Sequence, residues 1–228
     1  MSKGDAEARR LRATAYHEAG HAVARFALGR RIDRATIVPD EEDQTLGHVQ
    51  GRILLRSEKL EAGIGEFDTL RERKAAEDAI VSALAGPIAE AKLTGRRNLL
   101  GASGDDRSVD DVAEALHGRG DVASAYIGYL EALARGTVET LWYLVEALAA
   151  ELLLRETLSG AAVHRLLWEV VRREASVLWP DLFEPGTITV QRDGETSDLT
   201  LAPKFGESMP AAGRRQLAWT VGRDLSQS

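Results

Sequence analysis

The sequence predicts a mainly helical fold with a small β element, followed by a C-terminal extension that contains a β-hairpin. Apolar residues recur at helical spacing through most of residues 5–178. Two short stretches between the first helical regions alternate apolar and polar residues or are rich in β-branched ones, which is typical of strands. After residue 180, two Thr-containing segments flank the turn Arg192-Asp193-Gly194-Glu195. We therefore expect a main domain over residues 1–180 and an extension of unassigned role over residues 181–228.

Composition limits the classes of protein that this chain can form. The 228 residues are 44% hydrophobic and 29% charged, enough for a real core and a charged surface. The net charge of −7 argues against a general nucleic-acid binder. Without cysteine, disulfides and thiolate zinc ligands are excluded, which fits a cytoplasmic location. We expect no signal peptide and no membrane span, because residues 1–12 are charged and the most apolar segment, 137–154, carries glutamates.

A His-Glu-x-x-His sequence lies in the first expected helix, which runs over about residues 5–28 and ends at Gly29. His17 and His21 are four residues apart, so they share one helix face and can bind the same Zn²⁺ ion. Glu18 follows His17 directly, which places it beside the metal, where it can take a proton from a zinc-bound water. The alternative is an ordinary helix with two hydrogen-bonded histidines.

The residues around this motif indicate a packed helix. Gly20 costs about 1 kcal/mol relative to alanine in a helix interior, which indicates close approach of another backbone or room for a substrate. The apolar stripe of this helix contains Tyr16, Ala19, Val23 and Phe26.

Two strands are expected after this helix. Residues 34–39 and 46–51 have strand patterns, and the acidic residues 40–43 between them indicate a solvated turn. His48 lies in the second strand without acidic neighbours, so we expect an exposed side chain and not a third metal ligand.

The pattern is helical again from about residue 67. Gly86 and Pro87 interrupt it and predict a kink or a split. Glu90 follows this pair and can be a metal ligand, a surface charge or an acceptor for the second N–H of a ligating histidine; we favour the acceptor. The apolar side of this helix is expected to contain Leu70, Ala76, Ile80, Leu84, Ile88 and Ala91.

Asp105 and Asp106 follow a loop rich in glycine and basic residues, 95–104. The helical pattern restarts with Val109, so Ser103 or Asp105 can cap that helix. One of the carboxylates can instead be the third zinc ligand, and composition alone does not decide between these interpretations.

Three further helices are expected over residues 121–134, 137–155 and 159–178. The middle one is amphipathic and is expected to face the core. Ser159 is the expected N-cap of the last helix.

Three segments together resemble the peptidase domain of FtsH, the family of ATP-dependent zinc proteases. They occur in the order that the family shows. The first is Ala15-Tyr16-His17-Glu18-Ala19-Gly20-His21-Ala22-Val23 with Ile37-Val38-Pro39 and Leu46-Gly47, the second is Ala85-Gly86-Pro87-Ile88-Ala89-Glu90 with Gly101-Ala102-Ser103-Gly104-Asp105, and the third is Glu156-Thr157-Leu158-Ser159-Gly160.

The resemblance implies a zincin-type helical peptidase domain. The third zinc ligand of the family is the last residue of a Gly-Ala-Ser-Asn-Asp segment, which matches Asp105, with Asp106 as the fallback; Gly104 replaces the family's Asn. Glu90 matches an acidic position near the family's metal. Residues 46–50 resemble an edge strand to which an extended substrate can add. The sequence has no phosphate-binding Gly-x-x-x-x-Gly-Lys-Ser/Thr motif, hence no sign of the family's ATPase module.

We therefore predict a soluble, ATP-independent zinc metalloendopeptidase that hydrolyses peptides or unfolded segments. His17, His21 and Asp105 would hold Zn²⁺, and Glu18 would be the catalytic base. A separate ATPase and a homo-oligomer are the partners that the resemblance allows besides the substrate. One alternative is a non-catalytic, zinc-stabilised interaction module, against which the intact Glu18 argues. Another is a metal-free adaptor in which Asp105 and Asp106 cap a helix.

Overall fold

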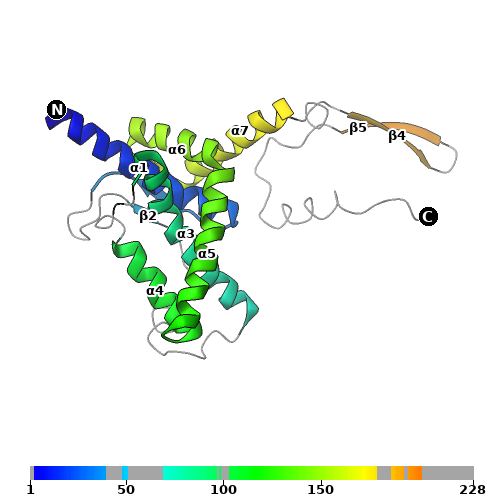
Figure 1. The fold of residues 1–228 in the computed structure, drawn as a ribbon. Coiled ribbons are helices and arrows are strands. Elements are labelled where there is room, and N and C mark those ends of the chain that lie inside the picture. Colours follow the sequence, from blue (N-terminus) through cyan, green and yellow to red (C-terminus); the bar gives the residue numbers. More distant parts are fainter. Residues whose placement is uncertain are drawn as a thin grey trace. The chain divides into compact units, whose positions relative to one another are not determined.

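The computed structural model describes residues 3–39, 48–50, 69–96, 98, 103–178, 186–192 and 195–201. Within these residues the fold is mainly helical, as the sequence predicts (Figure 1). The chain divides into two compact units, Met1–Val171 and Arg172–Ser228. In chain order the elements are α1 (Lys3–Ala27), β1 (Arg34–Thr36), β2 (His48–Gln50), α3 (Leu70–Thr94), α4 (Ser103–His117), α5 (Asp121–Thr140), α6 (Trp142–Arg155), β3 (Thr157–Ser159), α7 (Gly160–Leu178), β4 (Gly186–Arg192) and β5 (Glu195–Leu201).

Helix α1 carries the His-Glu-x-x-His sequence at its centre. It ends as predicted, because Gly29 has the left-handed φ of 66° that a C-terminal cap favours. Residues 4–12 of α1 are exposed, whereas the predicted apolar stripe lies against the core. The second half of α1 is therefore held by packing, which fixes the direction of the residues on its flank.

A three-stranded antiparallel sheet forms the β element of the first unit. Among the described residues its order is β2-β1-β3, with β1 at the centre and β2 at an edge. The sequence predicts β1 and β2 but not β3, which has three residues and pairs Thr157 with Thr36. The hydroxyl groups of these two threonines are 2.7 Å apart. The sequence does not predict β3 because its pairing partner lies 121 residues away.

Helix α3 begins with a capping box, in which Thr69 and Glu72 satisfy each other's backbone N–H groups. Of the kink or split expected at Gly86–Pro87, the split does not occur, since α3 continues through both residues to Thr94. Leu70 corrects a second expectation, because it is 87% exposed and does not join the apolar side of the helix.

The core of the first unit consists of two clusters that meet at α3. One cluster surrounds α1 and includes buried residues of β1, α6 and the first part of α7, together with Ala85 and Ala89 of α3. The other joins α4 and α5 to Ile80 and Leu84 of α3. Helix α3 therefore fixes α1 on one side and α4 on the other.

The later helices differ from expectation mainly at their ends. α5 continues to Thr140, and Leu141 separates it from α6, so the expected break near residue 135 is wrong. Ser159 precedes α7, and its hydroxyl accepts the Ala162 N–H at 3.3 Å, as expected of an N-cap. Within the described residues, each helix is too short or too polar to cross a bilayer.

The second unit contains the expected β-hairpin. Strands β4 and β5 pair in antiparallel register from Gly186 opposite Leu201 to Arg192 opposite Glu195. The acidic turn expected at residues 40–43 lies outside the described residues, as do residues 97 and 99–102 of the expected 95–104 loop.

Candidate metal centre

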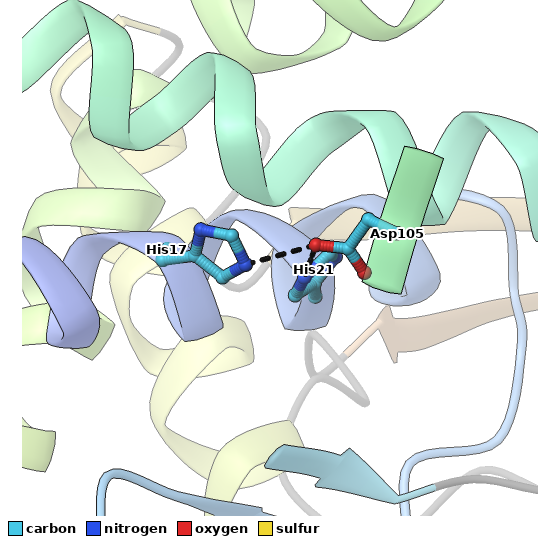
Figure 2. A group of neighbouring side chains, drawn as sticks. All are labelled: His17, His21 and Asp105. Atoms are coloured by element: carbon cyan, nitrogen blue, oxygen red, sulfur yellow. Dashed lines mark hydrogen bonds and ion pairs between the residues drawn. The ribbon is translucent and has the colours of Figure 1, made fainter. Parts of the chain in front are cut away.

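Two helices that are distant in sequence bring the three predicted metal ligands together. His17 and His21 lie on α1, and Asp105 lies in the first turn of α4 (Figure 2). The Asp105 Oδ2 atom is 3.1 Å from His17 Nε2 and 3.4 Å from His21 Nε2. One potential ligand atom from each residue lies within 4.8 Å of the others.

The other nitrogen of each histidine is held by α3. His17 Nδ1 is 3.0 Å from Glu90 Oε2, and His21 Nδ1 is 2.7 Å from the backbone oxygen of Ser82. Both partners are hydrogen-bond acceptors, so each Nδ1 donates a proton. In neutral histidine this leaves Nε2 with a free lone pair, and in both residues that lone pair faces Asp105.

Glu90 lies where an acceptor for a ligating histidine is expected. Its Oε2 atom accepts from His17 and its Oε1 atom accepts from Asn98 Nδ2 at 3.0 Å. The sequence interpretation identified Glu90 but not Ser82 or Asn98. Ser82 contributes a backbone atom and Asn98 lies in a loop, so no residue-type pattern points to either one.

The donor atoms present in this cluster fit a zinc ion. Ligand atoms of a tetrahedral zinc site with bonds of 2.0–2.1 Å are about 3.3 Å apart, close to the observed separations of 3.1 and 3.4 Å. Two Nε2 lone pairs and a carboxylate are all acceptors, so they need protons or a cation between them. The Asp105 side chain is 25% exposed, which leaves the cluster accessible on that side.

The pKa shifts of the metal-free protein show the same need for positive charge. Burial lowers the pKa of His17, but hydrogen bonds to Asp105 and Glu90 outweigh it and raise that pKa to about 10. Burial likewise opposes protonation of His21, and Asp105 reverses the direction and raises its pKa. Partial burial raises the pKa of Asp105, yet His21 and His17 outweigh it and hold that pKa well below the usual range. Protons therefore occupy the places that a cation would fill.

Glu18 is buried beside this cluster, with 5% of its surface exposed. Burial raises the pKa of its carboxyl, and the nearby His21 and His17 partly oppose that shift. No hydrogen bond to its carboxylate is found within the described residues. A carboxylate with a raised pKa next to a cation site is suited to accept and return a proton.

The structure describes Asp106, the alternative third ligand, but not the side chain of His48. Helix α4 begins at Ser103, so Asp105 lies inside its first turn and not at the expected capping position. Asp105 joins the histidine cluster, and among the described residues Asp106 is not part of that group. The His48 side chain lies outside the described part of the chain, so its expected exposure stays a prediction.

Two histidines one helical turn apart, a distant aspartate and an adjacent glutamate are the side-chain types of open, catalytic zinc sites. The chain is 33% identical over 178 residues to the ATP-dependent zinc metalloprotease FtsH 1 of Symbiobacterium thermophilum. The match covers 71% of this chain and 30% of that protein, so the chain spans less than a third of its relative. This similarity relates the chain distantly to zinc metalloproteases of the FtsH type. No family model matches the chain.

Proposed function

We propose that the chain is a zinc metalloendopeptidase that hydrolyses peptides and already unfolded segments without ATP. The observation that supports this most directly is the convergence of His17 Nε2, His21 Nε2 and Asp105 Oδ2, with both Nδ1 atoms held by α3. These three residues would hold Zn²⁺ and leave a position open. When bound, the metal would make a water molecule more acidic and polarise the scissile carbonyl group.

Glu18 supplies the proton transfer in this proposal. Its carboxylate would accept a proton from the attacking water and deliver it to the leaving amine. The bond broken is the peptide C–N bond, and the bond formed joins the carbonyl carbon to the water oxygen. Burial raises the pKa of the Glu18 carboxyl, which makes its carboxylate a stronger base toward the attacking water.

The edge strand β2 is the proposed place for an extended substrate. β2 pairs with β1 on one side only within the described residues, and it packs against α1. An extended peptide can add to such an edge through backbone hydrogen bonds, which are independent of sequence. This mode requires an unfolded segment, so a separate ATPase is the partner that would extend the activity to folded proteins.

The test is the variant Glu18→Gln, which keeps the shape of the side chain and removes its basicity. We expect wild-type zinc content, measured by elemental analysis, and at least about a hundredfold loss in the cleavage rate of unfolded casein. Glu139→Gln, at an exposed position of α5, is the matched control and should cleave like wild type. Undiminished cleavage by Glu18→Gln would refute the assigned role.

A parallel measurement on Asp105→Ala tests the metal site. We expect about one zinc per wild-type chain and a weakened or lost site in the variant, because one of the three ligands is removed. Zinc in wild type without cleavage would favour the zinc-stabilised interaction module. A wild-type protein that binds no zinc would refute both zinc-dependent functions.

A further inference from the structure

The imidazole of His21 lies directly against Gly86 of α3. A Cβ atom built on Gly86 would be 2.4 Å from His21 Nε2, 2.5 Å from Cε1 and 2.8 Å from Cδ2. Ordinary contacts between such atoms are about 3.5–4.0 Å. A side chain as small as a methyl group at this position would therefore have to displace the ring by about 1 Å.

The ring spans one turn of α3. Its Nδ1 atom donates to the carbonyl oxygen of Ser82, and its Nε2 edge lies over Gly86, four residues later. Residues four apart share a helix face, so the hydrogen bond and the bare Cα atom form one surface. That surface sets both the rotation of the imidazole and the place of the atom that faces Asp105.

A second glycine permits the same approach from α1. A Cβ atom on Gly20 would lie 2.5 Å from the Ala85 oxygen and 2.7 Å from the Ala89 Cβ. This confirms the sequence expectation that Gly20 allows close approach of another backbone. The two glycines differ in what they contact, because Gly20 meets α3 itself whereas Gly86 meets a metal-facing side chain.

We propose that Gly86 is a positioning residue of the metal centre, which it serves by leaving room for the His21 imidazole. This inference rests on the proposed zinc function. Ligand atoms of a metal site tolerate displacements of about 0.2 Å, far less than a side chain at Gly86 would impose. The His21 imidazole thus excludes a side chain at Gly86, whereas at most positions inside a helix alanine is more favourable than glycine.

The first experiment measures the zinc dissociation constant of wild type, Gly86→Ala and Gly128→Ala by chelator competition. Gly128 is the matched control, since it lies inside α5 and a Cβ atom there meets nothing within 4 Å. We expect a constant about 10–100-fold higher for Gly86→Ala, as for the loss of other groups that orient metal ligands. Gly128→Ala should bind zinc like wild type. Wild-type affinity in Gly86→Ala would overturn the positioning role and leave the proposed function intact, whereas a wild type without zinc would refute that function.

The second experiment separates the cost of the clash with the His21 imidazole from the cost of alanine to the backbone of α3. Alanine before Pro87 also disfavours helical geometry, whatever faces it. Thermal unfolding of metal-free wild type, Gly86→Ala, His21→Ala and the double variant forms a cycle. We expect Gly86→Ala to lower the midpoint less when His21 is already absent. An equal drop in both backgrounds, or failure of both Gly86 variants to fold, would assign the cost to the backbone and overturn the proposal; recovery of folding only in the double variant would support it.

Discussion

Glu90 joins two hydrogen-bond donors that come from different parts of the chain. Its Oε2 atom accepts from His17 Nδ1 and its Oε1 atom accepts from Asn98 Nδ2, each at 3.0 Å. Glu90→Gln keeps the shape of the side chain but offers one oxygen and one NH₂ group. If the amide oxygen of the variant side chain faces His17, its NH₂ group faces Asn98. The Asn98 amide must then rotate so that its oxygen can accept a hydrogen bond. The His17 bond then survives without the negative charge that strengthens it.

The expected cost follows from that geometry. Replacing an acceptor that orients a ligating histidine typically weakens metal binding about 10–100-fold, or about 1.4–2.7 kcal/mol. We expect Glu90→Gln to fall at the lower end of this range, because the hydrogen bond remains. Glu90→Ala should fall at the upper end, because it leaves His17 Nδ1 and Asn98 without this acceptor.

The assay is competition for zinc with a fluorescent chelator at pH 7, with Glu139→Gln as the exposed, matched control. Circular dichroism of each metal-free variant shows whether the fold is retained. A Glu90→Ala variant that is folded and binds zinc as tightly as wild type would refute the reasoning, because the Glu90 carboxylate would then contribute nothing to the orientation of His17.

Two further predictions follow from the metal-free site and from the packing of α7. The pKa of His17 rises from 6.5 in the unfolded chain to about 10 in the folded, metal-free protein, so protonated His17 stabilises the fold. This contribution to the free energy of unfolding is complete below pH 6.5 and is lost as the pH rises toward 10. Thermal unfolding in EDTA should therefore show a falling midpoint over that window, and calorimetry in buffers of different ionisation enthalpy should show proton release on zinc binding; a flat midpoint would contradict the assignment. Gly160→Ala would place a Cβ atom 1.8 Å from the Ile32 oxygen, so we expect a loss of about 1–3 kcal/mol in urea unfolding with unchanged zinc affinity. Gly136→Ala, where a Cβ atom meets nothing within 4 Å, should unfold at or above the wild-type midpoint.

Helices were predictable wherever a local signal was strong. The apolar stripe and Gly29 predicted a helix over about residues 5–28, and α1 covers Lys3–Ala27. The helix does not split at Gly86–Pro87, because packing on both faces of α3 outweighs the local cost of proline and glycine. Strand β3 was not predicted for another reason, which is that its pairing partner is distant and its three residues show no apolar periodicity.

The sequence by itself determined the part of the site that a single helix sets. His17, Glu18 and His21 share a flank of α1 because helical periodicity fixes their relative directions, and this spacing predicts a cation site in any fold that retains the helix. The family resemblance pointed to Asp105, while the residue types alone left capping and ligation equally open. The geometry of a single helix does not decide whether Asp105 caps a helix or binds a metal.

Only the tertiary structure decided which groups complete the site. Asp105 reaches His17 across 88 residues because α3 packs against both α1 and α4, and no local pattern encodes that distance. The same packing brings the Ser82 carbonyl and the bare Cα atom of Gly86 against His21. These contacts involve a backbone oxygen and a glycine that has no side chain, so residue types in the sequence do not predict them. They depend on how closely the two helices approach.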